Sequence, residues 1–483
     1  MKSSDKPNIL WICTDQQRWD TLGCYGNRAV STPHLDKLAE GGTLFESAYS
    51  QSPVCTPSRA SMLTGRYPRT TNCRQNGQSI STTETLVTRI LADAGYTCGL
   101  AGKLHISPCH PSAAPVREHR INDGYAEFHW SHHPDPDWPT NEYIEWLRQK
   151  DVEFERKTYS GSPYVECGMP ADQHHTTWCT QKAIEFIEAN SPFQKPWLFS
   201  LNFFDPHHPF DPPQEYLQRY LDKLEAIPLP NYEQGELTNK PLFQLNDHIS
   251  AYGGNAGYPF DKMTAKDHRL IRAAYWAMCD LIDDQVGRLL SALQQSGQSQ
   301  RTIVIFMSDH GEMLGDHGIY LKGPYFYEPA IHIPLIMSWP GRITGGGRIK
   351  SFVELVDLAP TLLDAANLPA PPAMQGRSLW PILTNSGQSY VHRNDVYCEY
   401  YNAMPWHSDP KAYGTMVRTN RYKLVVMHGQ STGELYDLEA DPNETYNLWN
   451  DTRSSLAKTE LLQLLCDRMA WTIDPLAERK APF

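Results

Sequence analysis

Short apolar runs that alternate with helix-type segments constrain the fold of this chain more than any other feature of its sequence. Each apolar run has the length of a buried strand, and segments with helical periodicity lie between the runs. This alternation is typical of a parallel sheet covered by helices on both faces. We therefore predict an α/β fold with a large, mostly parallel central sheet flanked by helices. The expected strands are residues 8–13, 96–101, 197–203, 302–307 and 333–338, and the main expected helices are residues 33–40, 84–94, 176–189 and 273–293.

Capping signals mark the start of two of these helices. Thr32 and Pro33 suit an N-cap and a first helical residue. Ser81 and Glu84 have the spacing of a capping box, and Gly95 suits the end of the helix that would follow. We therefore expect that second helix to begin close to residue 82.

A second unit is expected after residue 370, because the run 368–373 reads LPAPPA and punctuates the chain. Short β-type runs beyond it predict a small antiparallel sheet, and a helical pattern predicts a terminal helix. We expect a large N-terminal domain over residues 1–370 and a C-terminal α+β subdomain over residues 371–483. The expected C-terminal elements are strands at 395–401, 415–418, 422–427 and 434–438 and a helix near 455–471.

The segment 105–164 is rich in His, Trp, Pro and Asp and has weak periodicity. It is either an insertion near a binding mouth or an irregular surface loop, and the sequence leaves both open. Aromatic side chains at 128–138 and 397–406 could form a wall for a sugar face or for an aryl ring.

The overall charge excludes some partners. The 483 residues carry 43 Lys plus Arg against 55 Asp plus Glu, a net charge of −12, which argues against a nucleic acid or an anionic membrane as the main partner. The N-terminal region enters a strand pattern directly, without a signal-peptide core, and no apolar stretch is long enough to span a bilayer. We therefore expect a cytoplasmic protein, whose 11 scattered cysteines are reduced thiols.

The sharpest motif is Cys-x-Pro-Ser-Arg at Cys55–Arg59, followed by Leu-Thr-Gly at residues 63–65. Pro57 suits the first turn of a helix and Gly65 its end, so Cys55 would lie at the positive end of a short helix, where an anion is stabilised. The alternative is a buried structural cysteine beside a capped helix. A buried structural cysteine rarely has this set of neighbouring residues, so the motif favours a chemical role for Cys55.

Two residue pairs that each begin with Asp come directly after apolar runs. Asp15-Gln16 comes after the run 8–13, and Asp309-His310 comes after the run 302–307. Open α/β sheets place their sites at the carboxyl ends of strands. Such an Asp can simply cap a helix, but two pairs rich in oxygen ligands favour a hard divalent cation.

With these motifs the sequence resembles the type I sulfatases, members of the alkaline phosphatase superfamily, and the resemblance implies an alkaline-phosphatase-like fold. It implies that a formylglycine-generating enzyme oxidises Cys55 to formylglycine (3-oxoalanine), whose hydrate is the nucleophile, and that Arg59 orients it. The implied metal ligands are Asp15, Gln16, Cys55, Asp309 and His310. The family often has Asp in place of Gln16; the ion implied is Ca²⁺, with Mn²⁺ or Mg²⁺ as alternatives.

The Lys-x-His pattern of the family matches Lys103 and His105 after the run 96–101. The resemblance implies that Lys103 neutralises sulfate oxygens and that His105 takes a proton from the spare hydroxyl of the hydrate. Without the other motifs these residues would be a solvated lysine and a loop histidine.

Three further residues are assigned only through the resemblance. His207, in a His-x-Pro pattern, would protonate the leaving alcohol and bind the substrate. Lys322 matches the later lysine that grips sulfate, and Asn76 lies where related hydrolases contact the transferred group. Each alone is a weak signal, because Lys and Asn are common in loops.

The predicted activity is hydrolysis of a sulfate ester to an alcohol and inorganic sulfate, with a sulfated carbohydrate as the expected substrate. An aryl- or choline-type sulfatase is an alternative. A phosphonate monoester or phosphodiester hydrolase of the same superfamily is another, with which Gln16 and His310 are compatible, whereas Lys103 and His105 favour sulfate. A third is a catalytically silent anion- or sugar-binding protein with unmodified Cys55.

Overall fold

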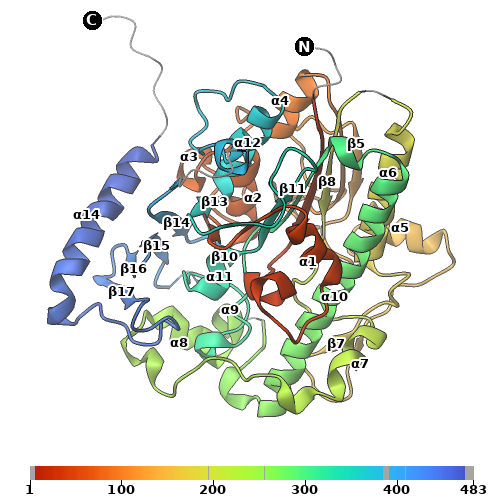
Figure 1. Cartoon of the computed structure of the whole chain (residues 1–483). Coiled ribbons are helices and arrows are strands. Elements are labelled where there is room, and N and C mark those ends of the chain that lie inside the picture. Colours follow the sequence, from red (N-terminus) through yellow and green to blue (C-terminus); the bar gives the residue numbers. More distant parts are fainter. Residues whose placement is uncertain (1–5, 194, 255, 385–390, 408, 474–483) are drawn as a thin grey trace, which may run out of the picture.

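The computed structural model describes residues 6–193, 195–254, 256–384, 391–407 and 409–473. An eight-stranded sheet runs through the molecule (Figure 1). Its centre is parallel, whereas β11 pairs antiparallel with both of its neighbours. The predicted α/β class is confirmed. In spatial order the strands are β12 (Gly347–Ile349), β2 (Thr43–Phe45), β11 (Leu335–Ser338), β9 (Thr302–Ser308), β1 (Asn8–Thr14), β8 (Trp197–Asn202), β4 (Thr97–Gly102) and β5 (Glu127–Trp130).

Helices cover both faces of this sheet because its central strands are apolar on both sides. Along β1, Ile9 and Trp11 pack into one core with α2, α4 and α12, whereas Leu10 and Ile12 pack into another with α1, α6 and α10. Figure 1 shows α6 and α10 together on one side of the sheet. These helices are α1 (Pro33–Glu40), α2 (Cys55–Thr64), α4 (Val87–Asp93), α6 (His175–Asn190), α10 (Ala265–Gln295) and α12 (Leu358–Ala365).

Several shorter elements complete the N-terminal part. A three-stranded sheet has the order β10-β3-β13, and β6 pairs antiparallel with β7. The bounds are β3 (Ala48–Tyr49), β6 (Lys157–Thr158), β7 (Glu166–Cys167), β10 (His332–Ile333), β13 (Val353–Glu354), α3 (Pro68–Thr71), α5 (Glu142–Arg148), α7 (Gln214–Leu221), α8 (Leu242–Ile249), α9 (Ala251–Gly254), α11 (Glu328–Ile331) and α13 (Trp380–Thr384).

Two local predictions were wrong. The expected strand 333–338 is split at Pro334 into β10 and β11, which belong to different sheets, because proline has no N–H to donate to a ladder. The expected capping box at Ser81 and Glu84 is a turn, in which the Glu84 N–H donates to the Ser81 carbonyl oxygen at 3.0 Å. Helix α4 begins later, at Val87.

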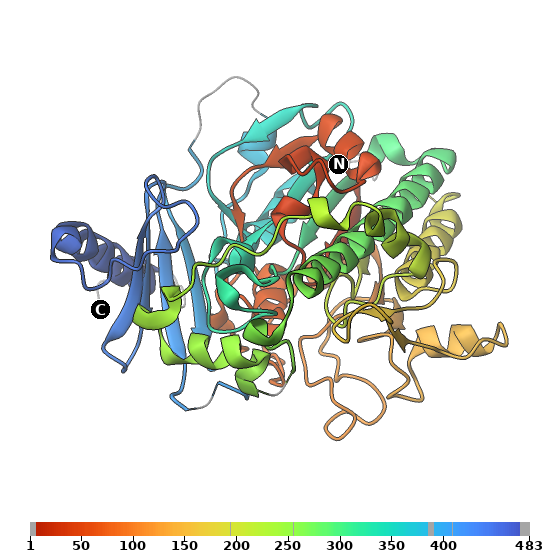
Figure 2. The ribbon, with the colours of Figure 1, turned by 90° about the horizontal axis from the view of Figure 1, so that it is seen from below.

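The segment 105–164 is not wholly irregular. It contributes β5, which extends the main sheet beside β4, and helix α5. Figure 2 shows this segment on the side of the molecule opposite the C-terminal sheet.

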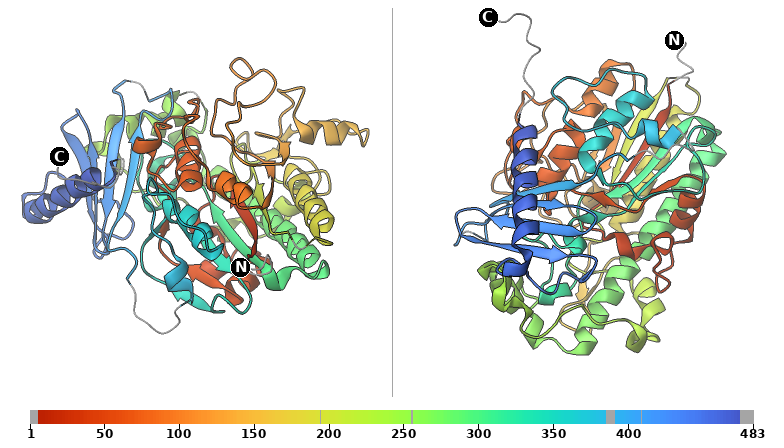
Figure 3. Two further views of the ribbon diagram at one scale, coloured as in Figure 1. Left: turned by 90° about the horizontal axis from the view of Figure 1, so that it is seen from above. Right: turned by 60° about the vertical axis from the view of Figure 1, so that its left-hand side comes forward.

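The C-terminal elements match the prediction closely. Strands β14 (Val396–Tyr401), β15 (Tyr413–Arg418), β16 (Tyr422–Met427) and β17 (Thr432–Asp437) form an antiparallel meander, and α14 (Ser455–Trp471) lies against it (Figure 3). Leu461 and Leu465 of α14 pack with Tyr67 and Val356 of the N-terminal part. The division at residue 370 stays a prediction.

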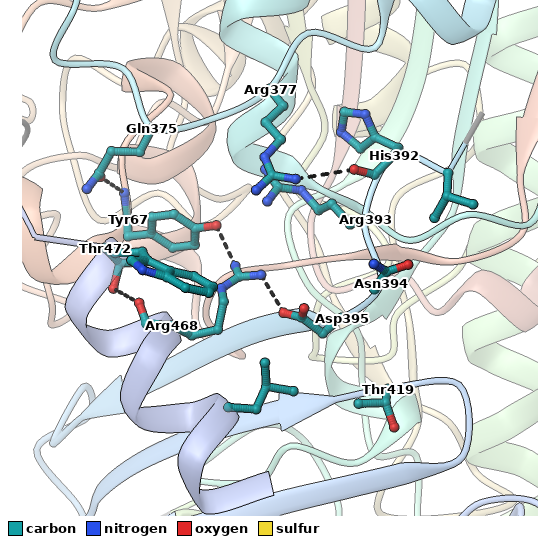
Figure 4. Close-up of a pocket in the computed structure, with 13 residues that line it drawn as sticks. Tyr67, Gln375, Arg377, His392, Arg393, Asn394, Asp395, Thr419, Arg468 and Thr472 are labelled. Carbon is teal, nitrogen blue, oxygen red and sulfur yellow. Dashed lines mark hydrogen bonds and ion pairs between the residues drawn. The ribbon is translucent and has the colours of Figure 1, made fainter. Parts of the chain in front are cut away.

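A cavity of about 550 Å³ lies between α14 and the N-terminal part (Figure 4). Arg468 spans it, donating to the Tyr67 hydroxyl at 2.7 Å and to Asp395 at 2.6 Å. All 11 cysteines are free thiols. Among the described residues, every helix is too short or too polar to cross a bilayer.

Candidate active site

The carboxyl ends of four adjacent parallel strands meet at one edge of the main sheet and carry most of the predicted site residues. Asp15 and Gln16 follow β1, His207 follows β8, Asp309 and His310 follow β9, and Lys103 with His105 follow β4. Cys55 is the first residue of α2, and Lys322 comes from the loop after β9. A site at this edge follows from the parallel topology.

Cys55 is buried among charged groups. Its Sγ lies 2.9 Å from Lys322 Nζ, 3.1 Å from His310 Nε2, 3.6 Å from Asp15 Oδ1 and 3.8 Å from Lys103 Nζ. Burial and Asp15 raise the pKa of the thiol, but Lys103, Lys322 and His310 together bring it below its usual value. The position therefore stabilises negative charge.

Arg59 fixes the two strand-end carboxylates. Its Nη2 donates to Asp15 at 2.9 Å and its Nε donates to Asp309 at 2.8 Å, with all three side chains fully buried. Its Nη1 donates to the Lys103 carbonyl oxygen at 2.8 Å. Arg59 lies on α2 one turn after Cys55, so it ties the position of the thiol to that of both carboxylates.

Four of the predicted metal ligands come together. One ligand atom each from Asp15, Cys55, Asp309 and His310 lies within 4.8 Å of the others. The His310 Nδ1 faces the Gly311 carbonyl oxygen at 2.9 Å, which leaves Nε2 for the site. Burial alone would lower the pKa of His310, but Asp309 and Cys55 raise it, so the site favours positive charge there. This donor set fits a divalent cation.

Gln16 turns into the same site with φ of 66°. Its Oε1 accepts from Lys322 Nζ at 2.8 Å, and its Nε2 donates to Glu312. Glu312 also accepts from the Leu314 N–H at 2.9 Å and is fully buried. The sequence analysis missed Glu312, although it lies three residues after Asp309 on the same loop.

Lys103 and His105 enter the site from the end of β4. A side chain at Gly102, where φ is 99°, would meet the Asn202 carbonyl oxygen at 1.9 Å, so only glycine lets the chain turn here. Lys103 Nζ lies 2.6 Å from Asp15 Oδ2. Burial, Lys103 and Arg59 hold the pKa of His105 well below its usual value, so its ring is neutral and able to accept a proton.

His207 and Lys322 form a hydrogen-bonded pair. The His207 Nδ1 lies 2.5 Å from the His208 carbonyl oxygen, so Nδ1 donates there and Nε2 accepts from Lys322 Nζ at 2.8 Å. Burial and Lys322 hold the pKa of His207 well below its usual value. In the free chain the His207 ring is therefore neutral.

Asn76 lies beside the nucleophile helix. Its Oδ1 accepts from the Thr56 N–H at 3.0 Å and satisfies one of the free donors in the first turn of α2. The half-buried Asn76 therefore lies close to Cys55 and caps the helix, and its contact with the transferred group stays a prediction.

Aromatic side chains approach the site from two sides. Tyr252 stacks on Trp406, with ring centroids 4.6 Å apart and planes at 7°, and Trp406 is 42% exposed. The Tyr252 ring also meets the ring of His208, with centroids 5.7 Å apart, and His208 is next to His207 in the chain. On the other side, the His133 ring lies 6.2 Å from Phe204.

Comparison with known proteins agrees with this geometry. The sulfatase family model matches residues 7–368, and a model of the N-sulphoglucosamine sulphohydrolase C-terminal region matches residues 315–470. An arylsulfatase of Clostridium perfringens is 30% identical over 463 residues, covering 92% of this chain and 90% of that protein. An N-acetylglucosamine-6-O-sulfatase of Bacteroides thetaiotaomicron is 27% identical over 518 residues, covering 96% of this chain and 86% of that protein.

Solved structures extend the likeness to the whole fold. A phosphonate monoester hydrolase from Silicibacter pomeroyi matches with a TM-score of 0.83 at 25% identity, covering 97% of this chain and 96% of that one. A protein solved with its substrate D-glucosamine-2-N,6-O-disulfate matches with a TM-score of 0.74 at 25% identity, covering 97% of this chain and 98% of that one. With the family model matched over most of its length, the chain belongs to the sulfatase family of the alkaline phosphatase superfamily and is a sulfuric ester hydrolase.

Proposed function

We propose that this enzyme hydrolyses the sulfate ester of a carbohydrate through a formylglycine made from Cys55. The observation that carries the proposal is the environment of Cys55, whose sulfur contacts Lys322, His310, Asp15 and Lys103. A sulfated substrate is an anion, and fixed cations around the attacking atom stabilise the charge that develops during transfer.

The first step would use one hydroxyl of the formylglycine hydrate at position 55. This hydroxyl gives its proton to the Asp15 carboxylate, whose Oδ1 lies 3.6 Å from the Cys55 sulfur, and its oxygen bonds to sulfur as the bond from sulfur to the alcohol oxygen breaks, with Lys103 and Lys322 holding the sulfate oxygens. The departing oxygen takes a proton from the Lys322–His207 pair. The resemblance assigns that proton to His207 alone, but a neutral His207 ring hydrogen-bonded to Lys322 favours the pair as the source.

The second step would release sulfate. His105 takes the proton of the remaining hydroxyl, the carbonyl re-forms and the bond from carbon to the sulfate oxygen breaks. The lowered pKa of His105 keeps its ring neutral and ready to accept that proton. Water then adds to the aldehyde to restore the hydrate.

Asp15, Gln16, Asp309 and His310, with the modified residue 55, would hold a divalent cation. Three of these residues with Cys55 form the ligand cluster described above, and Gln16 would add an amide oxygen. Their oxygen-rich set favours Ca²⁺, with Mn²⁺ or Mg²⁺ as alternatives. Such an ion would add positive charge against the sulfate oxygens and the nucleophile.

Relatives support a saccharide substrate. Relatives with 27% and 28% identity are named N-acetylglucosamine-6-O-sulfatase and iduronate 2-sulfatase. The Tyr252–Trp406 stack, whose Tyr252 ring also contacts His208, offers a partly exposed aromatic face, which suits the apolar face of a sugar ring.

A phosphonate monoester hydrolase remains the second candidate. The TM-score of 0.83 to such an enzyme favours it, and Gln16 and His310 are compatible with it. Lys103 and His105 favour sulfate, because a cation and a base at these positions serve release of sulfate from the hydrate.

Two measurements test the proposal. Mass spectrometry of the peptide across Cys55, from protein co-expressed with a formylglycine-generating enzyme, should find the aldehyde in place of the thiol. The modified protein should then release sulfate from sulfated amino sugars faster than it cleaves an aryl phosphonate. An intact thiol together with full activity would overturn the mechanism, and a large phosphonate preference would favour the second candidate.

A further inference from the structure

A second cluster of metal-ligating side chains lies beside the catalytic residues, within the segment that follows β4. One ligand atom each from His105, Cys109 and His132 lies within 4.8 Å of the others. The two imidazole rings meet edge to face with centroids 4.5 Å apart. Tetrahedral Zn²⁺ bound by two nitrogens and one sulfur needs ligand atoms about 3.3 to 3.8 Å apart, so a small closing movement would suffice.

Both histidines have a nitrogen that the protein does not satisfy. The Nδ1 atoms of His105 and His132 are buried without a hydrogen-bond partner, in side chains of residues only 7% and 9% exposed. Buried polar atoms are nearly always paired, so each unpaired nitrogen calls for a partner. A metal ion bound at the cluster would provide one.

The charges around the cluster are compatible with a cation. Glu118 is buried. It accepts from the backbone N–H of His105 at 3.1 Å and from the Trp130 Nε1–H at 3.0 Å. The Cys109 thiol donates to the Ser107 carbonyl oxygen at 3.3 Å. Lys103, a cation two residues before His105, is already paired with Asp15 at 2.6 Å.

We propose that His105, Cys109 and His132 form a binding site for a thiophilic divalent ion of the Zn²⁺ class, distinct from the Asp15–Asp309 site. The ligands are two imidazoles and one thiolate, a set that suits Zn²⁺ and disfavours Ca²⁺. Binding replaces the thiol proton of Cys109 by a metal–sulfur bond, and that proton leaves to solvent.

The test uses Co²⁺ as a coloured substitute for Zn²⁺ in metal-free full-length protein that carries Cys55→Ala. This background removes the only cysteine of the Asp15–Asp309 cluster, so that site cannot supply a thiolate. We expect a near-ultraviolet charge-transfer band from one thiolate, saturating at one ion per chain. Zn²⁺ should abolish the band by competition.

Matched variants decide the assignment. Cys109→Ser should remove the band, His132→Asn should weaken Co²⁺ binding at least about tenfold, and Cys466→Ser, at an exposed cysteine outside the cluster, should leave it unchanged. Thermal unfolding identifies any variant that fails to fold. A band that survives Cys109→Ser, or is absent from the Cys55→Ala protein, would overturn the site.

A second measurement distinguishes failure of the metal site from failure of the proposed function. The two proposals share one residue, His105, and the metal site rests on the proposed function only through it. In mature enzyme, Zn²⁺ bound at the cluster occupies His105, so sulfate release should be inhibited, and Cys109→Ser should raise the half-inhibiting Zn²⁺ concentration at least about tenfold. Binding without inhibition would support the metal site and count against His105 as the base.

Discussion

Two groups of buried charges in this molecule have the same kinds of side chains but a different balance of positive and negative charge. The catalytic-edge cluster has Asp15, Asp309, Arg59, Lys103 and Lys322. The interface cluster, beneath α14 beside the cavity of Figure 4, has Glu354, Asp357, Arg393 and Arg468.

In the interface cluster each cation has a carboxylate of its own. Arg393 pairs with Asp357 and lies 3.2 Å from Glu354, and Arg468 donates to Glu354 at 2.8 Å. Burial would raise the pKa of Asp357, but Arg393 and His392 hold it well below its usual range. Each of the two arginines is therefore neutralised by carboxylates from other parts of the chain, so this cluster joins those parts.

At the catalytic edge, Arg59, Lys103 and Lys322 face the carboxylates of Asp15 and Asp309, whereas the third buried carboxyl group, Glu312, has its pKa raised by burial, which favours its neutral form. The excess positive charge is directed at Cys55, which Lys103 and Lys322 both contact. The comparison shows that burial of ion pairs does not identify an active site. What identifies an active site is a local excess of one sign of charge around one reactive side chain.

The largest expected effect is loss of the reactive side chain itself. Cys55→Ala should lower kcat/KM on a sulfate ester by at least about 10⁴-fold, because it removes the nucleophile. Cys466→Ser, at an exposed cysteine, should leave kcat/KM unchanged. Substantial turnover by Cys55→Ala, measured as sulfate release, would exclude covalent catalysis at this position.

Removing one arginine from each cluster should separate their roles. Arg59→Met and Arg393→Met each take the arginine from a buried carboxylate, Asp309 or Asp357, so each should lower the free energy of unfolding by about 3 to 5 kcal/mol. Ca²⁺ should restore part of the stability of the Arg59 variant, because Asp15 and Asp309 can bind it. The Arg393 variant is the control, in which Ca²⁺ should have no effect on the denaturation midpoint.

Equal Ca²⁺ rescue of both variants would mean that the two clusters do not differ as described. No rescue of either would argue against a cation site between Asp15 and Asp309.

His207 provides a smaller effect that depends on the leaving group. His207→Ala should slow hydrolysis of a sugar sulfate by at least about 10²-fold, because an alkoxide needs a proton as it leaves. On 4-nitrophenyl sulfate, whose phenolate leaves without one, the loss should be less than about tenfold. His208→Ala is the matched control, since its ring stacks on His207 at 4.1 Å but the proton path does not need it.

His208→Ala should slow both substrates equally. An equal loss on both substrates in His207→Ala would assign His207 to binding rather than to proton transfer.

The sequence was sufficient to predict most of the fold, because the relevant signals are local. Strand β1 is a continuous apolar run, and α10 shows a long helical period. The C-terminal meander was predicted nearly to the residue from its turns. The short strands β2, β3 and β12 were not, because two- or three-residue strands depend on pairing partners far away in the sequence.

The candidate site residues were predicted from motifs, whereas their partners were not. Asp15 and Asp309 stand at recognisable strand ends, but Glu312, which holds Gln16, has no local signal. Likewise, nothing in the sequence indicated that His132 would lie beside His105, 27 residues earlier in the chain. Such contacts arise from how loops fold back, which depends on tertiary packing.

The smallest expected effect concerns acid stability, where the two regions should again differ. Near the catalytic edge, burial, His174 and His133 hold the pKa of His175 well below its usual value of 6.5. Below pH 6.5 the unfolded chain therefore binds a proton at this histidine that the folded chain does not bind. The contribution of His175 to the free energy of unfolding is fully present above pH 6.5 and falls by about 1.4 kcal/mol per pH unit as the pH decreases below it. Asp357 of the interface cluster, with its pKa depressed, contributes stability that is lost only below about pH 3.8.

Unfolding midpoints measured in urea from pH 7.5 to 5 test this difference. The urea midpoint of His175→Asn should fall less steeply with decreasing pH than that of the wild type. In this variant the unfolded state no longer binds one proton more than the folded state at position 175. His110→Asn, at an exposed histidine, is the control and should follow the wild type. If His175→Asn has the wild-type slope, the acid sensitivity originates elsewhere, and buried neutral histidines do not distinguish the catalytic edge from the interface cluster.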